Sequence, residues 1–315
     1  MCIRDRPYIV GVGAANLDLN GASCAPIHLR DSNPGHISLS AGGVTRNVCE
    51  NLARLDADVK LLSCVGDDGF GSYIRRSCVE AGIDIRYLHE AKGAHSSIYL
   101  SILDADGDML VGMSDMRIVQ QDLPADYLPS QKQLIQGAKV VTCDPCMGET
   151  ALLQLLDLCQ PSQIVSVDPV SCAYARVVAP LIGRFHTAKP NRMELEILAG
   201  MEIRSDADLQ RAGEVVLGKG LKRLFVSLGA EGCFYMDDTG AVLRRKLRPA
   251  KMVNASGAGD SFAAAMLYAT LQGYDAEKTL DYGMAAGIAA VTHERTINPN
   301  MSVPLLESIL QTYRL

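Results

Sequence analysis

Short apolar runs alternate with stretches of helical periodicity in the part of the chain that follows residue 138. This alternation predicts strands that are each followed by a helix. The expected strands lie at 139–142, 164–167, 186–188 and 224–228, with helices between them near 148–159, 174–183 and 191–217. Repeated strand–helix units favour an α/β fold with a mostly parallel central sheet and helices on both of its faces.

The chain before residue 138 has a mixed pattern in which alternating segments and helical segments both occur. The expected elements are strands at 8–13, 37–40 and 59–65 and helices at 44–55 and 71–81. The first helix is predicted from an apolar stripe, and the second ends at Gly82. Three further helices, at 258–271, 276–292 and 303–313, are expected at the C-terminal end.

Two hairpins are predicted, one joining 96–103 to 109–113 and one joining 233–236 to 242–245. The first hairpin and the extended stretch 17–40 are the long pieces that have no helix between them. We therefore expect about 17–41 and 94–118 to form a small β sheet that stands off the main body and covers a site as a lid. The prediction is one three-layer α/β/α domain over 7–315, with residues 1–6 as a disordered or artefactual leader.

Composition narrows the function classes. The chain has 315 residues, a formal net charge of -6 and a sequence pI near 5.5. A nucleic-acid binder needs a basic face, so we expect no nucleic-acid partner, and no apolar run reaches the length of a membrane span. The ten cysteines are scattered along a chain too large to need disulfides, and no secretory leader is apparent, which favours reduced thiols in the cytoplasm.

The stretch at 254–261 carries the clearest chemical signal. Gly257, Ala258 and Gly259 precede a strongly helical sequence, and the first N–H groups of a helix have no internal partner. Small residues let an anion approach these groups closely, which makes a phosphate site. Asp260 would then stand beside an anion hole, where its carboxylate could take a proton from an attacking hydroxyl. The alternative is an acid that only caps the helix or balances its dipole.

Polar residues near the start of the chain are candidates for binding a sugar. Asn16 and Asp18 lie two apart on an extended segment and so point to one face, from which they could grip neighbouring hydroxyls. A turn-forming Asn and a solvated Asp are the alternative. Asn47 lies one helical turn beyond Gly42 and Gly43, where it could reach a ligand over the glycines or remain solvated.

Further polar groups follow the predicted parallel strands, at the edge where ligands of α/β sheets bind. They are Asp144, Asp168, Lys189, Asn191, Glu194, Ser227 and Gly229.

Other motifs give weaker signals. Cys143 and Cys146 form a CxxC without a second pair, so we interpret them as structural cysteines and not as a redox or zinc site. The six histidines show no ligand spacing, and a Walker phosphate loop is absent from the sequence. The glycines at 11 and 13 lack the helix that a dinucleotide fingerprint requires.

Six motifs together resemble the ribokinase family of sugar and nucleoside kinases, in the order of that family and over nearly the whole chain after residue 7. They are Asn16-Leu17-Asp18, Gly42-Gly43 with Asn47, Gly66-Asp67-Asp68-Gly69, Asn191-Arg192-Met193-Glu194, Ser227-Leu228-Gly229-Ala230-Glu231-Gly232 and Gly257-Ala258-Gly259-Asp260. The resemblance implies a ribokinase-like fold and transfer of phosphate from ATP to a hydroxyl group.

The resemblance also implies a role for each matching residue. Asp260 would take the proton from a ribose 5′-hydroxyl as it attacks the γ-phosphate of ATP, while the N–H groups of 257–259 hold the developing charge. Asn191 and Glu194 would position Mg²⁺ through waters. The acceptor is assigned to Asn16, Asp18, Ser32, Asn33, Gly42, Gly43, Asn47 and Lys189, and the nucleotide to Asn191, Ser227, Gly229, Gly232, Asn254 and Gly257.

Within the family, residues 31–35, 40–47 and Asn254 are similar to the pseudouridine kinases. The implied reaction is phosphorylation of pseudouridine to its 5′-phosphate. Other nucleoside or sugar kinases, and a non-catalytic nucleoside-binding protein of the same fold, are the alternatives. Exposed edges of lid sheets often pair between subunits, so a homodimer through the lid is expected, and activation by a monovalent cation such as K⁺ is left open.

Overall fold

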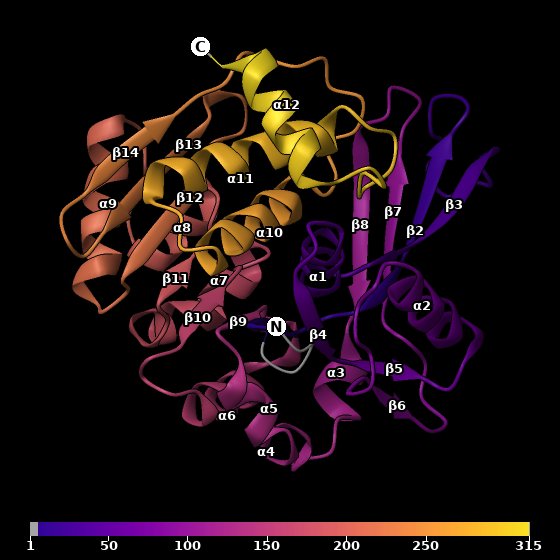
Figure 1. Ribbon diagram of the computed structural model, residues 1–315. Helices are drawn as coiled ribbons and strands as arrows, with labels where there is room; N and C mark the ends of the chain where they lie inside the picture. The colour runs from indigo at the N-terminus through magenta and orange to yellow at the C-terminus, as the bar shows by residue number, and fades with distance from the viewer. Residues whose placement is uncertain (1–5, 315) are drawn as a thin grey trace.

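A large mixed sheet forms the centre of the computed structural model, which describes residues 6–314 (Figure 1). Its eight strands, in spatial order, are β14 (Val242–Arg245), β13 (Cys233–Asp237), β12 (Arg223–Ser227), β11 (Thr187–Ala188), β10 (Ile164–Val167), β9 (Val140–Cys143), β1 (Tyr8–Val12) and β4 (Asp58–Leu62). The pairings from β12 to β4 are parallel, and β13 and β14 add an antiparallel edge. The parallel strands end at one edge of the sheet, where the predicted polar groups follow them.

Helices cover both faces of this sheet, so the predicted three-layer α/β/α arrangement is confirmed. One face packs against α3 (Arg117–Gln121), α4 (Tyr127–Ser130), α5 (Lys132–Gly137), η2 (Pro145–Met147), α6 (Glu149–Leu158), α7 (Cys172–Val178), η3 (Ala179–Arg184), α8 (Arg192–Ala199) and α9 (Asp206–Gly218). The other packs against α1 (Val44–Arg54), α2 (Gly69–Glu80), α10 (Ala258–Leu271) and α11 (Ala276–Val291), with α12 (Val303–Tyr313) on α11. The short turn η4 (Gly229–Glu231) joins β12 to β13.

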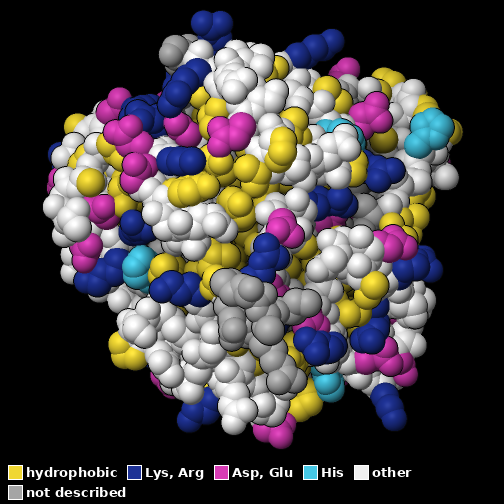
Figure 2. Space-filling model, viewed as in Figure 1, with side chains coloured by type: hydrophobic (Ala, Val, Ile, Leu, Met, Phe, Trp, Pro, Cys, Tyr) yellow, Lys and Arg dark blue, Asp and Glu magenta, His cyan; other side chains and the backbone are white. Residues whose placement is uncertain are grey.

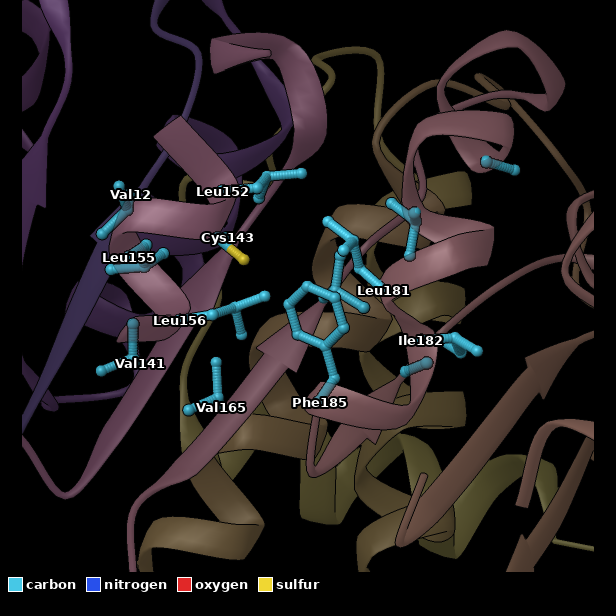
Figure 3. Close-up of a cluster of buried hydrophobic side chains, with 14 of the residues drawn as sticks. Val12, Val141, Cys143, Leu152, Leu155, Leu156, Val165, Leu181, Ile182 and Phe185 are labelled. Atoms are coloured by element: carbon cyan, nitrogen blue, oxygen red, sulfur yellow. The ribbon is translucent and has the colours of Figure 1, made fainter. Parts of the chain in front are cut away.

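Alternation along the strands divides the core between the two faces. In β1, Val10 and Val12 point to the first face and Ile9 to the second. Figure 3 shows the first face, where side chains of β9 and β10 meet Leu152 and Leu155 of α6 and Phe185, which follows η3. Both faces of each central strand are therefore buried, as expected for parallel strands.

Several predicted elements are divided differently in the structure. The strand predicted at 59–65 is two strands, because β5 (Cys64–Gly66) leaves the main sheet and pairs with β6 (His89–Ala91). The helix predicted at 191–217 is two helices, α8 and α9, because Gly200 ends α8 in the left-handed region at φ 74°. Residues 1–6 are predicted to be a disordered or artefactual leader, and residues 1–5 of this segment lie outside the described residues.

A second sheet of four strands, the lid sheet, stands beside the main sheet (Figure 1). Its order is β3 (Gly35–Gly42), β2 (Asn16–Ser23), β7 (Ile98–Leu103) and β8 (Met109–Asp115). Paired residues share a face, so Asp18, Ser40 and Tyr99 lie on one face and Leu39, Leu100 and Met113 on the other. The lid sheet therefore has a polar face and an apolar face.

The buried carboxylate of Asp144 joins the ends of β9 and β1 to the start of α1. Its Oδ2 accepts hydrogen bonds from the backbone N–H groups of Ala14 (3.0 Å) and Thr45 (3.1 Å), and its Oδ1 accepts one from Cys146 (2.9 Å). A side chain at Gly13 would overlap this carboxylate. The sequence placed Asp144 at a strand end, and the structure gives it a structural role there.

In the part of the chain that the structure describes, the surface charges and the cysteines do not point to a further functional site. Figure 2 shows Lys and Arg side chains interspersed with Asp and Glu across the face that it draws. Cys143 and Cys146 are buried free thiols, as the structural interpretation predicts. Within residues 6–314, no helix combines the length and the apolar character that a bilayer crossing requires.

Candidate active site

The candidate site lies where α1 and α10 begin, beside the carboxyl ends of β10 and β11. The two helices pack against each other, and Asn47 Nδ2 of α1 donates a hydrogen bond to Asp260 Oδ2 of α10 at 2.8 Å. These residues are 213 positions apart in the sequence, so the fold brings two of the predicted motifs together. Asp260 lies in the first turn of α10 and is only partly exposed.

The start of α10 has the geometry of an anion site. Gly257 precedes the helix with φ 76°, and a side chain there would overlap the carbonyl of Thr296. The first intrahelical bond runs from the Ser261 N–H to the Gly257 carbonyl, so the N–H groups of Ala258 and Gly259 precede the helical ladder. These groups and the helix dipole favour a negative charge beside Asp260.

Charged residues from neighbouring strand ends converge on Asp260. Lys189, which is 5% exposed, follows β11, and its Nζ lies 3.0 Å from Asp168 Oδ2 at the end of β10. Burial and the charge of Asp168 raise the pKa of Asp260 to about 7, although the Asn47 hydrogen bond and Lys189 oppose the shift. Burial lowers the pKa of Lys189, but the ion pair with Asp168 outweighs it and the net shift is upward. A carboxylate with a pKa near 7 is suited to accept a proton from a hydroxyl group.

The turn after β10 is strained. Val170 has φ 66°, a conformation that is rare for a β-branched residue, and its N–H donates to Asp168 Oδ1 at 2.9 Å. This turn holds Asp168 toward Lys189. Backbone strain of this kind is concentrated at functional sites.

The root of the lid sheet adds a second carboxylate. Asn16 Nδ2 donates to Asp18 Oδ1 at 2.6 Å, which orients the two side chains together. The Asp18 carboxylate lies directly against Gly42, because a side chain at Gly42 would overlap it, and Gly43 adopts φ 99°. Burial raises the pKa of Asp18 to about 6, and the Asn16 hydrogen bond opposes this shift. Asn16, Asp18, Gly42 and Gly43 thus form one surface at the root of the lid sheet.

Asn191 and Glu194 form a reciprocal capping box at the start of α8. The backbone N–H and the Nδ2 of Asn191 each donate to one oxygen of Glu194 at 2.8 Å, and the Glu194 N–H donates to Asn191 Oδ1. Burial raises the pKa of Glu194, and the charge of Asp168 adds to the shift. Within residues 6–314, no three His, Cys, Asp or Glu side chains converge to hold a metal directly. The remaining lone pairs of Glu194 could accept hydrogen bonds from metal-bound waters, so the pair fits Mg²⁺ in a water-mediated site.

Several predicted residues lie apart from this cluster or serve the backbone. Ser32 and Asn33 are in the turn between β2 and β3, at the far end of the lid sheet from Asn16, and Asn33 binds the backbone of His28. Asn254 accepts from the Ser256 N–H and donates to the Glu294 carbonyl.

The predicted nucleotide residues after β12 surround the turn η4. Ser227 bridges to Asn191, which places this turn beside the start of α8. Gly229 and Gly232 both have positive φ, at 57° and 96°. Glycine at both positions allows this tight turn, whose Glu231 pairs with Arg192 of α8.

Sequence reasoning misses the roles of two residues in the cluster. It places Asp168 at a strand end but gives it no binding or catalytic role, although Asp168 pairs with Lys189. Arg46 is 2% exposed and contacts Asn47. The signal for Arg46 was its spacing of four from Glu50, which places an acid and a base on one helix face.

Comparisons with known proteins identify the family and the fold of the chain. The model of the pfkB family carbohydrate kinases matches residues 6–303. The pseudouridine kinase of Escherichia coli (strain K12) is 33% identical over 309 residues, covering 98% of each chain. The guanosine-inosine kinase of Exiguobacterium acetylicum is 28% identical, covering 93% of this chain and 97% of that protein. The structure of Arabidopsis thaliana ribokinase complexed with ribose and ATP superposes with a TM-score of 0.85 at 20% identity, covering 98% and 99%. The ribokinase-like fold is thereby confirmed.

Asp260→Asn separates the chemistry of this site from its stability. We expect turnover to fall by roughly a hundredfold to ten-thousandfold, because the Asn amide cannot accept the proton that we expect the Asp260 carboxylate to take from a hydroxyl group. The folded pKa lies above that of an unfolded Asp, so ionised Asp260 destabilises the fold increasingly as the pH rises from about 4 to 7. At pH 8 the Tm of the variant should therefore equal or exceed that of the wild type. The difference between the two Tm values should be smaller at pH 5.

The exposed Asp157, which pairs with Arg184 on the surface, offers the matched control Asp157→Asn. That variant should keep wild-type turnover. Near-normal turnover by a folded Asp260→Asn protein would remove Asp260 from the chemistry.

Proposed function

Because the chain belongs to the pfkB family of carbohydrate kinases, we propose that it transfers the γ-phosphate of ATP to the 5′-hydroxyl of pseudouridine. The observation that carries this proposal is the Asn47–Asp260 hydrogen bond. It joins α1, which begins beside the root of the lid sheet, to a carboxylate in the first turn of α10 whose pKa is about 7.

Asp260 acts as the general base. It takes the proton of the 5′-hydroxyl as that oxygen attacks phosphorus, and the N–H groups of Gly257, Ala258 and Gly259 stabilise charge on the transferring group. Lys189 lies next to Gly259 and can neutralise the same charge or meet the base of the acceptor. Phosphoryl transfer depends chiefly on such positioning and electrostatic stabilisation.

The acceptor sugar binds between the root of the lid sheet and α1. Asp18, with its partner Asn16, accepts hydrogen bonds from ribose hydroxyls, and Asn47 contacts the sugar on the side of Asp260. Gly42 and Gly43 complete this surface, because the absence of a side chain at each lets the Asp18 carboxylate and the Ala14 carbonyl lie against them. The polar face of the lid sheet covers the acceptor and limits the access of water.

The nucleotide lies over the anion site, with Ser227, Gly229, Gly232 and Asn254 along its path. Asn191 and Glu194 would hold Mg²⁺ through waters, as their capping geometry allows. Mg²⁺ held there would supply positive charge against the phosphates. A ribokinase II structure from E. coli in complex with ATP and Mg²⁺ is 18% identical to this chain, so it supports this assignment only through the shared fold.

Pseudouridine is proposed as the acceptor on two grounds. The E. coli pseudouridine kinase is similar over 98% of this chain, and the motif at 40–47 is similar to that subgroup. The guanosine-inosine kinase similarity makes another nucleoside the main alternative.

We also propose that the protein forms a homodimer through the apolar face of the lid sheet. Ile37, Leu39 and Met113 on this face are 75%, 51% and 68% exposed. Apolar side chains this exposed on adjacent strands are typical of an interaction surface. A second copy would cover the same face on each subunit, as a twofold contact requires.

A panel of pseudouridine, uridine, ribose, adenosine and fructose with ATP and Mg²⁺ tests the acceptor. We expect the highest kcat/KM for pseudouridine, because residues 31–35 of the lid and the motif at 40–47 are similar to those of pseudouridine kinases. A higher kcat/KM for another acceptor would contradict pseudouridine as the acceptor but would support the kinase activity. If none of the five compounds is phosphorylated and a nucleoside binds tightly, the non-catalytic alternative is favoured.

Sedimentation velocity tests the dimer. We expect a wild-type dimer and a monomeric Met113→Lys variant, since a charge would be buried in the contact. Leu29→Lys changes a residue that is 78% exposed but lies outside the strands of the lid sheet, and it should remain dimeric. A monomeric wild type at micromolar concentration contradicts the proposal.

A further inference from the structure

Arg46 of α1 is a buried cation that has no role in the proposed reaction as described above. Its side chain is 2% exposed, and its guanidinium contacts three elements. One terminal nitrogen donates to the Ala41 carbonyl and to Asn47 Oδ1, both at 3.2 Å, and the other donates to Ser77 Oγ at 2.8 Å. The same group forms an ion pair with Glu50.

Stability alone explains this arrangement poorly. Removing a guanidinium and a carboxylate from water costs free energy that their attraction offsets only in part, and apolar residues of similar volume often replace such pairs without loss. Glu50 also pairs with Arg54 at 2.6 Å, on the side away from Asn47. Arg54 would remain as a partner for Glu50 without Arg46, so the contacts that Arg46 adds are those with Ala41, Asn47 and Ser77. Of these three, Asn47 is the residue that contacts Asp260.

The contact with Arg46 determines which end of the Asn47 amide faces Asp260. Arg46 has only donors, so it requires the oxygen of the amide, and Asn47 Oδ1 occupies that position. The NH₂ group is thereby turned toward Asp260, to which it donates at 2.8 Å. The reversed amide would place an oxygen against the carboxylate and two donors against each other.

We propose that Arg46 is a positioning residue, which holds the amide of Asn47 so that its NH₂ group orients the Asp260 carboxylate toward the acceptor. This inference rests on the proposed role of Asp260 as the base. The Ala41 carbonyl, at the root of β3, is bound by the same guanidinium, so the lid sheet and the base are aligned by one group.

The charges around Asp260 predict the effect of losing this contact. Asp260 is faced by Asp168 and Asp18, which raise its pKa, and by Lys189 and the Asn47 amide, which lower it. Without Arg46 the amide can rotate and its donor is lost, while the other groups remain. The pKa of Asp260 then rises, and the acid limb of kcat/KM moves to higher pH.

Arg46→Gln and Arg46→Lys test the proposal, with Arg54→Gln as the matched control. Arg54 shares Glu50 and donates to the Pro299 carbonyl, but it does not contact Asn47. We expect Arg46→Gln to lower kcat about tenfold, the effect of losing one hydrogen bond to a charged group. Arg54→Gln should leave the pH profile unchanged.

Lysine keeps the charge beside Glu50 but cannot donate in a fork to both Ala41 and Asn47. Arg46→Lys should therefore retain more stability than Arg46→Gln and still show the shifted acid limb. It keeps the test informative if Arg46→Gln does not fold.

Two readouts distinguish positioning from a general loss of structure. In the background of Asn47→Ala, Arg46→Gln should change kcat by less than about twofold, because the residue through which it acts is gone. The ¹³C signal of the Asp260 carboxyl should titrate at higher pH in Arg46→Lys than in the wild type, in protein without substrate.

Additive losses in the double variant, or an unchanged titration of Asp260, would overturn the role of Arg46. A wild type that phosphorylates none of the tested acceptors would count against the proposed function. The carboxyl titration would still test whether Arg46 acts on Asp260, so the two failures are distinguishable.

Discussion

The buried carboxylate of Asp144 is the interaction on which the rest of the site depends. It accepts hydrogen bonds from Ala14, Thr45 and Cys146, and so fixes where β1 ends, where α1 begins and how the turn after β9 runs. These donors lie at helix and strand ends, where N–H groups lack regular partners. Because α1 starts from this point, Asn47 reaches Asp260 from a fixed direction.

The site concentrates charge where an ordinary core would exclude it. Asp168, Lys189 and Asp260 meet at the ends of neighbouring elements, and burial keeps the pKa of Asp260 near 7. A fully solvated carboxylate would be a weaker base, and one without the Asn47 and Lys189 contacts would be more strongly protonated. The same burial that raises the pKa of Asp260 therefore costs stability, a trade-off that is common at functional sites.

Much of the fold was predictable from the sequence, because hydrophobic periodicity reports local structure directly. The glycines before Asp260 likewise signal a helix start. The pattern could not show that β5 leaves the main sheet, since an apolar run looks the same in either sheet. It could not show the contact of Arg46 with Asn47, which depends on side-chain direction, or that Ser32 lies at the far end of the lid sheet.

A crystal structure with pseudouridine, Mg²⁺ and a non-hydrolysable ATP analogue tests the central claim, that Asp260 is the base, most directly. The account predicts the 5′-oxygen within about 2.6–3.2 Å of the Asp260 carboxylate, with the terminal phosphate at the N–H groups that begin α10. A 5′-oxygen beyond hydrogen-bonding reach of Asp260, or a different acid or base beside it, would contradict the account.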